Sequence, residues 1–191
     1  MKLLKMAFIL WLINMFLVTF TCCLIYIVAQ QSLRLMANDI PTQIATDALI
    51  KLQDGQDLNN IISSNKIDIS KSISPFIMVY DNNKNLVEES GMMGNSKPTY
   101  PTSVLSSVDK KGESRVTWQP QAGMRFASIA VKYKDGYIVA ARSLKETEKV
   151  IDTIGKLVLI AWLAYAIFSF LVFGFYYLFT RNAGKPTQII K

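Results

Sequence analysis

Two arginines in the second half of the chain are the residues best suited to holding a ligand. Arg125 and Arg142 each lie at one end of a predicted strand. A guanidinium group presents a planar fork of donors that matches a carboxylate or a phosphate. These side chains therefore predict a site for a small anion. The competing explanation is an ion pair on the surface or at the edge of a sheet.

Other candidates combine a ring or an amide with a position on a strand: Trp118, Gln119, Tyr80, Tyr133 and Tyr137. An indole or a phenol could form the wall of a pocket, and packing in the core of the sheet is the competing explanation. Met92 and Met93 lie in a loop between two glycines. They could line the mouth of a pocket or cover the core.

The residue types on which most enzymes depend are absent or badly placed. The chain of 191 residues contains no histidine, which removes the commonest general base and metal ligand. Both cysteines lie in an apolar stretch, and no known catalytic or phosphate-binding motif occurs. Asp81 and Asp135 fit hairpin turns, and Glu88-Glu89 fits a solvated strand end. We therefore predict a protein that is not an enzyme and that has no cofactor or metal.

Two long apolar segments enclose the candidate residues. Residues 6–29 and 157–180 carry no charge, and each is longer than the roughly 20 residues that cross a bilayer as a helix. We predict that both are transmembrane helices. For the first segment a cleaved signal peptide is the alternative, although the apolar run is longer than that of the usual signal. A buried core helix is rarely so long or so uniformly apolar.

Positive charges at the two ends of the chain predict its orientation. The outer flanks of the apolar segments contain basic residues and no acidic ones: Lys2, Lys5, Arg181, Lys185 and Lys191. Because basic residues in short flanks stay in the cytoplasm, residues 1–5 and 181–191 are predicted to be cytoplasmic and residues 30–155 to lie outside. The net charge of +7 comes mainly from these flanks. It therefore does not predict nucleic-acid binding.

Residues 30–155 have the pattern of an α+β domain. A long helix is predicted over 30–53, with a bend near Pro41 and an end at Asp54-Gly55, and a short helix follows at 58–62. Apolar, β-rich runs, of which 114–118 and 125–132 alternate, then predict five strands, with one more short helix between the second and the third: strands 76–80, 86–87, 114–118, 125–132 and 137–141, and helix 104–108. Residues 91–102 are predicted to form a loop.

Turns and a cap complete this prediction. Residues 81–85 and 134–136 are predicted hairpin turns, in which Asn and Asp tolerate a positive φ. Ser143 and Glu146 predict a capping box at the start of an exit helix, which continues into the second apolar segment. The expected fold is a five-stranded antiparallel sheet flanked by helices, with a long N-terminal helix.

The sequence resembles the extracytoplasmic PAS-like, or single Cache, sensor domains of bacterial two-span receptors. The resemblance lies in the hairpin FIMVYDNNKNLV, the strand RVTWQP and the run RFASIAVKYKDGYIVAARSL before the exit helix. It covers residues 70–155 well and residues 30–69 only by topology. It implies a sensor in the bacterial plasma membrane, of the kind that begins the histidine kinases of two-component systems. Such domains bind a small molecule or a protein on one face of the sheet.

The same resemblance implies an output domain beyond the second span, such as a kinase, a cyclase or a methyl-accepting domain. Here the sequence ends eleven residues after that span, and residues 184–190, GKPTQII, resemble the opening of a HAMP linker. The expected output domain is therefore missing or belongs to a separate protein.

We expect a sensor or receptor subunit that transmits a signal through two membrane helices. The alternative is a membrane-anchored assembly factor that binds proteins and has no small-molecule ligand. The expected partners are the lipid bilayer, a small anionic ligand, a signalling protein and a second copy of the chain, since the entry, exit and transmembrane helices of two copies could form a four-helix bundle. A concave, partly polar cavity on the sheet would favour sensing, and a packed flat face would favour assembly.

Overall fold

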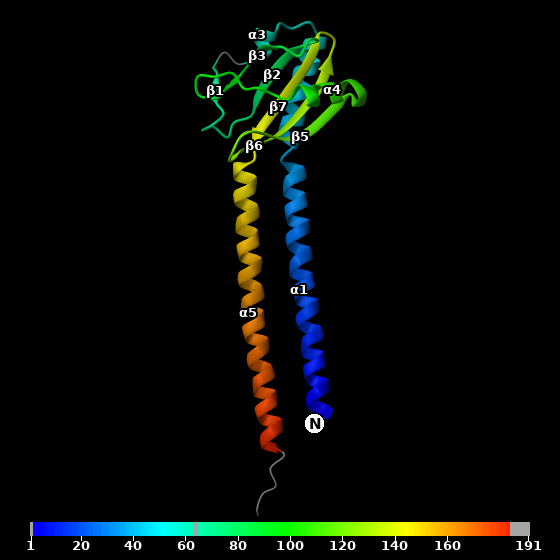
Figure 1. Ribbon diagram of the computed structural model, residues 1–191, viewed down its shortest axis with the longest axis vertical. Helices are drawn as coiled ribbons and strands as arrows, with labels where there is room; N and C mark the ends of the chain where they lie inside the picture. Colours follow the sequence, from blue (N-terminus) through cyan, green and yellow to red (C-terminus); the bar gives the residue numbers. More distant parts are fainter. Residues whose placement is uncertain (1, 63–64, 184–191) are drawn as a thin grey trace, which may run out of the picture. The chain divides into compact units, whose positions relative to one another are not determined.

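The computed structural model describes residues 2–62 and 65–183, which belong to two compact units (Figure 1). One unit is the domain Gln31–Val150. The other unit consists of the two terminal stretches, Met1–Gln30 and Ile151–Lys191. The predicted HAMP-like stretch 184–190 lies outside the described residues.

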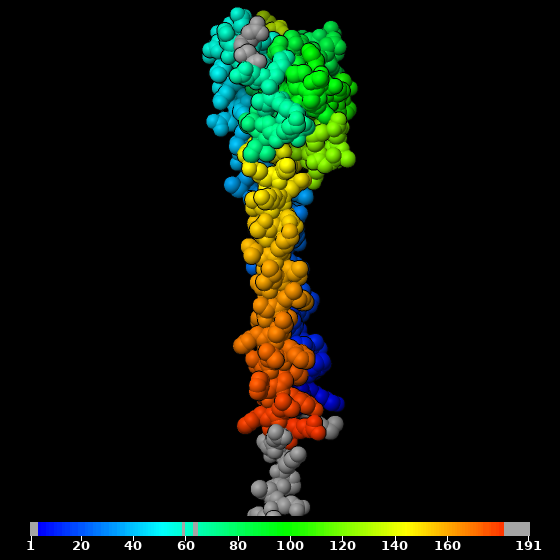
Figure 2. Space-filling view, turned by 90° about the vertical axis from the view of Figure 1, so that its left-hand side faces the viewer, coloured from blue at the N-terminus to red at the C-terminus, as the bar shows by residue number. Residues whose placement is uncertain are grey.

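Two long helices supply the terminal unit: α1 (Lys2–Met36) and α5 (Lys145–Ala183). Each contains one of the predicted apolar segments, and each is long and apolar enough to cross a membrane. Large apolar side chains are exposed along both, for example Phe16 at 70% and Phe175 at 75%. Figure 2 shows the side chains of α5, in orange to red, exposed on the face turned to the viewer. Such exposure fits the predicted lipid surroundings.

Side-chain hydrogen bonds join the apolar stretches of α1 and α5. The indole of Trp11 donates to the hydroxyl of Ser169 at 2.7 Å, and the indole of Trp162 donates to the hydroxyl of Thr19 at 2.9 Å. Partly covered residues recur every three or four positions on each helix. That is the spacing at which two helices pack side by side.

The predicted bend near Pro41 is a break between two helices. Helix α1 ends at Met36, and α2 (Asp39–Gln53) begins two residues before the proline. Proline cannot donate a backbone hydrogen bond, and its ring clashes with the carbonyl four residues earlier, which here belongs to Ala37. The chain therefore leaves the helix at Ala37. The predicted helix end at Asp54-Gly55 is confirmed. Asp54 is the C-cap residue of α2, and Gly55 after it has a φ of +79°.

The five-stranded antiparallel sheet is confirmed. The strand order is β3-β2-β7-β6-β5, and each pair of neighbours is antiparallel. The strands agree with the predicted segments and are somewhat longer: β2 (Phe76–Asp81), β3 (Leu86–Glu89), β5 (Glu113–Gln121), β6 (Met124–Tyr133) and β7 (Gly136–Ser143).

Two features between the helices and the sheet differ from the prediction. A short parallel pair, β1 (Ile67–Asp68) with β4 (Gly91–Met92), includes the start of the predicted loop 91–102. Helix α4 (Thr102–Lys111) is longer than predicted, whereas the short α3 (Leu58–Ile61) agrees with it. Gly91 is needed at this pair because a Cβ there would lie 2.6 Å from the Ile69 side chain.

The two faces of the sheet are covered by different elements. One face packs against α2 through small and branched residues, including Ala45, Ile129 and Ala140. The other face carries the larger core, over which α4 packs against β5 and β6. This second core is rich in rings: Phe76, Tyr80, Tyr100, Trp118, Phe126 and Tyr137. Both faces of the sheet are therefore closed by side chains.

The two hairpin turns follow the prediction, with one exception. Asp81 accepts a hydrogen bond from the backbone N–H of Asn85 at 2.7 Å, as a turn residue should. The positive φ in this turn, +65°, belongs to Lys84 and not to an Asn or Asp, so that part of the prediction was wrong. In the other turn Gly136 has a φ of +155°.

We expect Gly136→Ala to destabilise the domain far more than Gly123→Ala. Both glycines have a positive φ, which costs an L-residue about 1–2 kcal/mol. At Gly136 the new Cβ would also lie 1.9 Å from the Tyr80 carbonyl oxygen, whereas nothing lies within 4 Å of a Cβ at Gly123. Urea unfolding of the full chain in detergent, followed by Trp118 fluorescence in a W11F/W162F background, measures both. Equal losses of stability would contradict the close approach at Gly136.

Candidate functional site: a cavity at the start of helix α5

A polar cavity of about 140 Å³ opens between three parts of the domain. Its walls come from the loop after β1, the start of β6 with the turn before it, and the end of β7 with the first turn of α5. The polar side chains that line it are Ser70, Lys71, Ser72, Arg125, Ser143, Lys145 and Glu148. Of the two arginines predicted to bind an anion, Arg125 lies here.

The cavity is positively charged overall. Three cationic residues, Lys71, Arg125 and Lys145, and one carboxylate, Glu148, line it. Arg125 Nη1 donates to Glu148 Oε1 at 2.5 Å. The Arg125 side chain is 40% exposed and the Glu148 side chain 42%. An ion pair so open to water stabilises a fold by only about 0–1 kcal/mol. Arg125 is therefore paired but weakly held.

The start of α5 is tied to strand β6 by the backbone as well. The Leu144 N–H donates to the Arg125 carbonyl at 2.8 Å. The Ser143 hydroxyl accepts from the N–H of Lys145, the first residue of α5, at 3.3 Å. The Leu144 carbonyl accepts the first helical hydrogen bond, from Glu148, so Leu144 and not Ser143 is the N-cap residue. The predicted capping box therefore differs from the structure, in which the Glu146 carboxylate lies 3.5 Å from Arg142.

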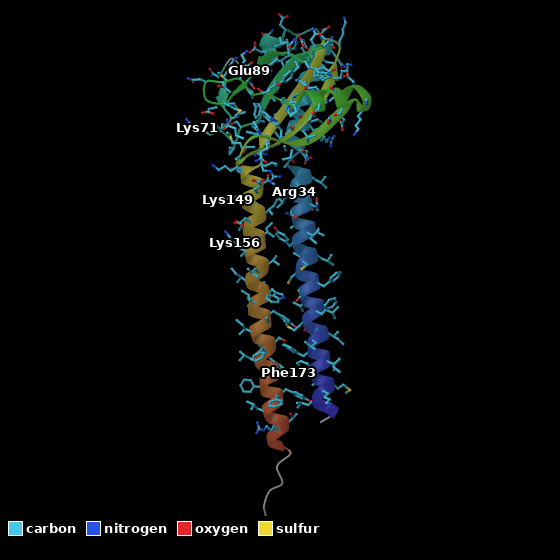
Figure 3. The ribbon with its side chains drawn as sticks, viewed as in Figure 1. Arg34, Lys71, Glu89, Lys149, Lys156 and Phe173 are labelled. Atoms are coloured by element: carbon cyan, nitrogen blue, oxygen red, sulfur yellow. The ribbon has the colours of Figure 1, made fainter. Side chains whose placement is uncertain are left out.

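The loop that forms the outer wall is held by Asp68. Its carboxylate accepts from the Ser70 hydroxyl at 2.6 Å, from the Ser70 N–H at 3.0 Å and from the Gly94 N–H at 3.4 Å. The Ser70 hydrogen bonds, first from the hydroxyl and then from the backbone, lower the pKa of the Asp68 carboxyl to about 2. Lys71, the next residue in this loop, is labelled in Figure 3, and its side chain is 85% exposed.

Arg142 does not join Arg125 in the cavity. It lies on β7 opposite Ala127 of β6, and its guanidinium faces Glu146 one turn along α5. The structure therefore supports the surface ion pair as the explanation of Arg142, while its role in ligand binding stays a prediction.

The aromatic candidates lie mainly in the core. Trp118 is 4% exposed and packs against Tyr100 and Phe126, with ring centroids 5.5 and 5.3 Å away. Its neighbour Gln119 is exposed on the opposite side of the strand. Met93 packs against the same core, and Met92 is partly buried.

The three candidate tyrosines have different surroundings. Tyr80 and Tyr137 are cross-strand neighbours in the core, and burial raises the pKa of Tyr80 to about 12. The Tyr137 hydroxyl donates to the Asp109 carboxylate, whose two oxygens lie 2.9 and 2.8 Å away. Tyr133 is partly exposed at the end of β6. The structure brings two of the three tyrosines together, and it places none of them in the cavity.

Glu89 is the residue whose environment the sequence does not predict. It was expected to be solvated, but its side chain is fully buried at the end of β3 (Figure 3). Lys66 Nζ lies 2.7 Å from Glu89 Oε1, and Lys97 Nζ lies 3.4 Å from Oε2 without hydrogen-bond geometry. A buried carboxylate needs such pairing. Lys66 lies 23 residues before Glu89 and Lys97 lies in the loop that follows β4, so no helical or strand periodicity reveals them.

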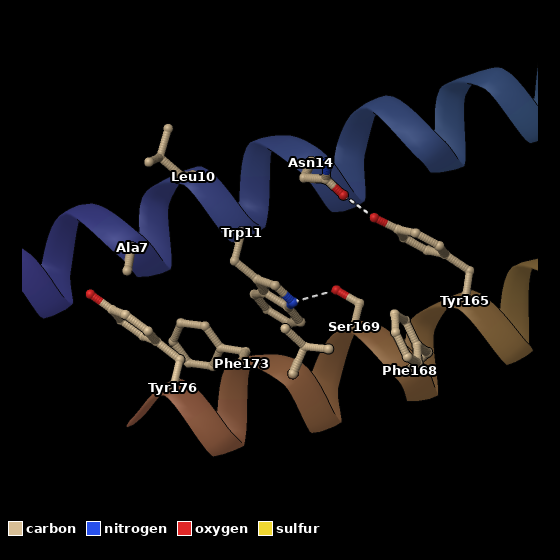
Figure 4. Close-up of a pocket in the computed structure, with 10 residues that line it drawn as sticks. Ala7, Leu10, Trp11, Asn14, Tyr165, Phe168, Ser169, Phe173 and Tyr176 are labelled. Carbon is tan, nitrogen blue, oxygen red and sulfur yellow. Dashed lines mark hydrogen bonds between the residues drawn. The ribbon is translucent and has the colours of Figure 1, made fainter. Parts of the chain in front are cut away.

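A second, apolar hollow lies in the terminal unit. A groove of about 470 Å³ runs between α1 and α5 and is lined mainly by rings, including Trp11, Tyr165 and Phe173 (Figure 4). The Tyr165 hydroxyl donates to the Asn14 amide oxygen beside it. This groove resembles a packing defect in a helix pair more than a polar binding site, and it has no charged lining residue.

No protein-family model, no curated protein and no solved structure matches this chain.

We expect Asp68→Asn to lower the melting temperature at neutral pH and to have less effect in acid. A carboxyl whose folded pKa is lowered stabilises the fold above its unfolded pKa, here 3.8, and that stabilisation is lost as the pH falls towards about 2. The difference in melting temperature between wild type and D68N should therefore shrink from pH 4 downwards. The control is D54N, at an exposed carboxylate. An equal change in D54N would exclude the local hydrogen bonds as the cause.

Proposed function

We propose that this chain is the sensor subunit of a membrane receptor and has no catalytic activity. Its α+β domain lies outside the cytoplasm, both termini lie in the cytoplasm, and α1 and α5 cross the bacterial plasma membrane. Two helices long and apolar enough to cross a membrane, one before and one after the compact domain in the sequence, support this arrangement. So do the basic flanks of the apolar segments.

The way α5 begins is the observation that carries the sensing role. Its first residues are attached to strand β6 by the Leu144–Arg125 backbone hydrogen bond and by the Arg125–Glu148 ion pair. The same helix then continues as one element to Ala183. A ligand that changes the contacts of Arg125 would therefore act on the first turn of the helix that contains the second apolar segment. A ligand shifts such an equilibrium only by its difference in affinity for the two states.

The PAS-like, or single Cache, assignment is part of this proposal. The observed order of elements supports it: a long N-terminal helix, a five-stranded antiparallel sheet and an exit helix. A signalling protein that carries the output domain, and a second copy of this chain, are the proposed partners.

An assembly factor is the second candidate, and one observation favours it. The sheet face beneath α4 is filled by Tyr100, Trp118 and Phe126, each at most 4% exposed. A small molecule could enter that face only by displacing packed rings. An outer domain whose sheet is closed in this way is suited to docking a protein on its surface.

Cysteine labelling in intact bacterial cells tests the membrane arrangement. In a C22A/C23A background, we expect a membrane-impermeant maleimide to label Gln119→Cys directly, and to label Lys191→Cys only after the cells are permeabilised. Gln119 is exposed on the domain. The reverse pattern would overturn the orientation, and extraction of the protein by alkaline carbonate would overturn the membrane spans.

A distance measurement tests sensing. Nitroxide labels at Lys5→Cys and Arg181→Cys, in the same background and in lipid nanodiscs, report the separation of α1 and α5 near their predicted cytoplasmic ends. A sensor should change this distance distribution when at least one pool of small metabolites is added. No change with any pool would count against a small-molecule sensor. Specific crosslinking of one defined protein to a photoreactive residue at Val87, which is 46% exposed on β3, would then favour the assembly factor.

A further inference from the structure

We propose that the cavity at the start of α5, which we call the Arg125 cavity, binds a small oxyanion, and that this anion takes the place of Glu148 at Arg125. The ligand class is a phosphate group or a small carboxylate. This inference rests on the proposed function in one respect: it names the class of ligand to which the sensor domain would respond. The evidence for binding itself is the cavity and its lining residues.

The charges that face the cavity favour an anion. Lys71, Arg125 and Lys145 come from three separate elements, and Glu148 is the one carboxylate among the described lining residues. Asp68 Oδ1 accepts the hydrogen bonds from Ser70 and Gly94, while Asp68 Oδ2 lies 3.5 Å from Lys71 Nζ. An added anion would therefore meet Lys145 besides Arg125, and it would share Lys71 with Asp68.

Hydroxyl groups supply neutral donors beside these charges. The Ser72 hydroxyl accepts from the Ser74 N–H at 3.1 Å, and the Ser143 hydroxyl accepts from the Lys145 N–H. A hydroxyl that accepts in this way also carries one O–H that can donate. Arginine and two hydroxyl donors together match an oxyanion with several acceptor oxygens.

The size of the cavity limits the ligand. Its volume of about 140 Å³ corresponds to the space of about four or five water molecules, at about 30 Å³ each. Phosphate, sulfate and small carboxylates are of this size, whereas a nucleotide is much larger. The cavity also fits the phosphate of a lipid headgroup, which offers the same chemistry from a different source.

Exchange of Glu148 for the ligand requires little free energy. The Arg125 and Glu148 side chains are 40% and 42% exposed, so water screens their ion pair and makes it weak. An oxyanion that accepts two hydrogen bonds from the same guanidinium can replace it. Glu148 then loses its tie to β6, and the first turn of α5 keeps the Leu144 N–H bond to the Arg125 carbonyl. Ligand binding would in this way alter how α5 is attached to the sheet.

Binding of inorganic phosphate and of succinate to the full chain tests the proposal. Calorimetry is carried out on wild type, R125Q, E148Q and R115Q in neutral phosphatidylcholine nanodiscs, with circular dichroism as the check on folding. Arg115 is the matched control, because it is half-exposed on β5 and is paired with Glu113 at 3.2 Å. We expect at least one probe to bind, R125Q to weaken it by about tenfold or more, and R115Q to leave it unchanged. E148Q should bind several-fold more tightly, because the competing carboxylate is gone.

A second measurement separates a free anion from a lipid. If neither probe binds wild type, native mass spectrometry compares retained phosphatidylglycerol with retained phosphatidylcholine. Enrichment that R125Q abolishes and R115Q preserves would support a headgroup phosphate as the ligand. Equal probe binding by folded wild type and R125Q would overturn the proposal, as would the absence of both probe binding and lipid enrichment. E148Q provides the test if R125Q does not fold.

Failure of this inference is distinguishable from failure of the sensing role. A metabolite that shifts the K5C–R181C distance equally in wild type and R125Q would retain the sensor and reject the Arg125 cavity as its site. Anion binding at Arg125 that leaves that distance unchanged would retain the site and reject transmission to the apolar helices.

Discussion

The pairing of β2 with β7 is the constraint on which the rest of the domain depends. It joins the first and last strands of the five-stranded sheet over six residue pairs, from Phe76 with Ala141 to Asp81 with Gly136. β3 is thereby placed on one side, and β6 and β5 on the other. The pairing is close at its end, where only a glycine fits against the Tyr80 carbonyl. Because α5 follows β7 directly, this central pair also fixes where the exit helix begins.

Closure of the sheet faces determines where a ligand can be accommodated. On the α4 side, the hydroxyl of Ser128 donates to the Val116 carbonyl, so the Tyr100 hydroxyl must be the donor in its 3.1 Å contact with Ser128. The Tyr100 and Ser128 hydroxyls are therefore both hydrogen-bonded within a core that is otherwise filled by rings. Truncating a buried Phe or Trp to Ala costs about 3–5 kcal/mol, which indicates how strongly a ligand entering this face would have to disturb the packing. A small polar molecule meets no such cost at the Arg125 cavity, which opens where β6 begins and β7 ends.

The sequence predicts the strands well because they are apolar runs rich in β-branched and aromatic residues, such as 76–80 and 137–141, that lie next to turn residues. It predicts the break near Pro41 to within a few residues because proline acts on a known carbonyl. The β1–β4 pair and the Glu89 contacts could not be predicted, since two-residue strands have no periodicity and no helical or strand periodicity links Lys66 or Lys97 to Glu89. Arg125 was identified from its chemistry alone. Its neighbours Lys71 and Glu148 become apparent only when three separate elements meet.

The terminal helices limit what kind of movement a signal could produce. The Trp11–Ser169 and Trp162–Thr19 hydrogen bonds point in opposite senses between α1 and α5, one indole from each helix. Sliding one helix along the other would break both bonds, at about 0.6 kcal/mol each in a bilayer and at most about 1.7 kcal/mol. A weak ion pair such as Arg125–Glu148 involves free energies of similar size. A small rotation or tilt of α5 that preserves both indole bonds therefore requires less free energy than a piston-like shift, and it is the movement that the proposed exchange at Arg125 would favour.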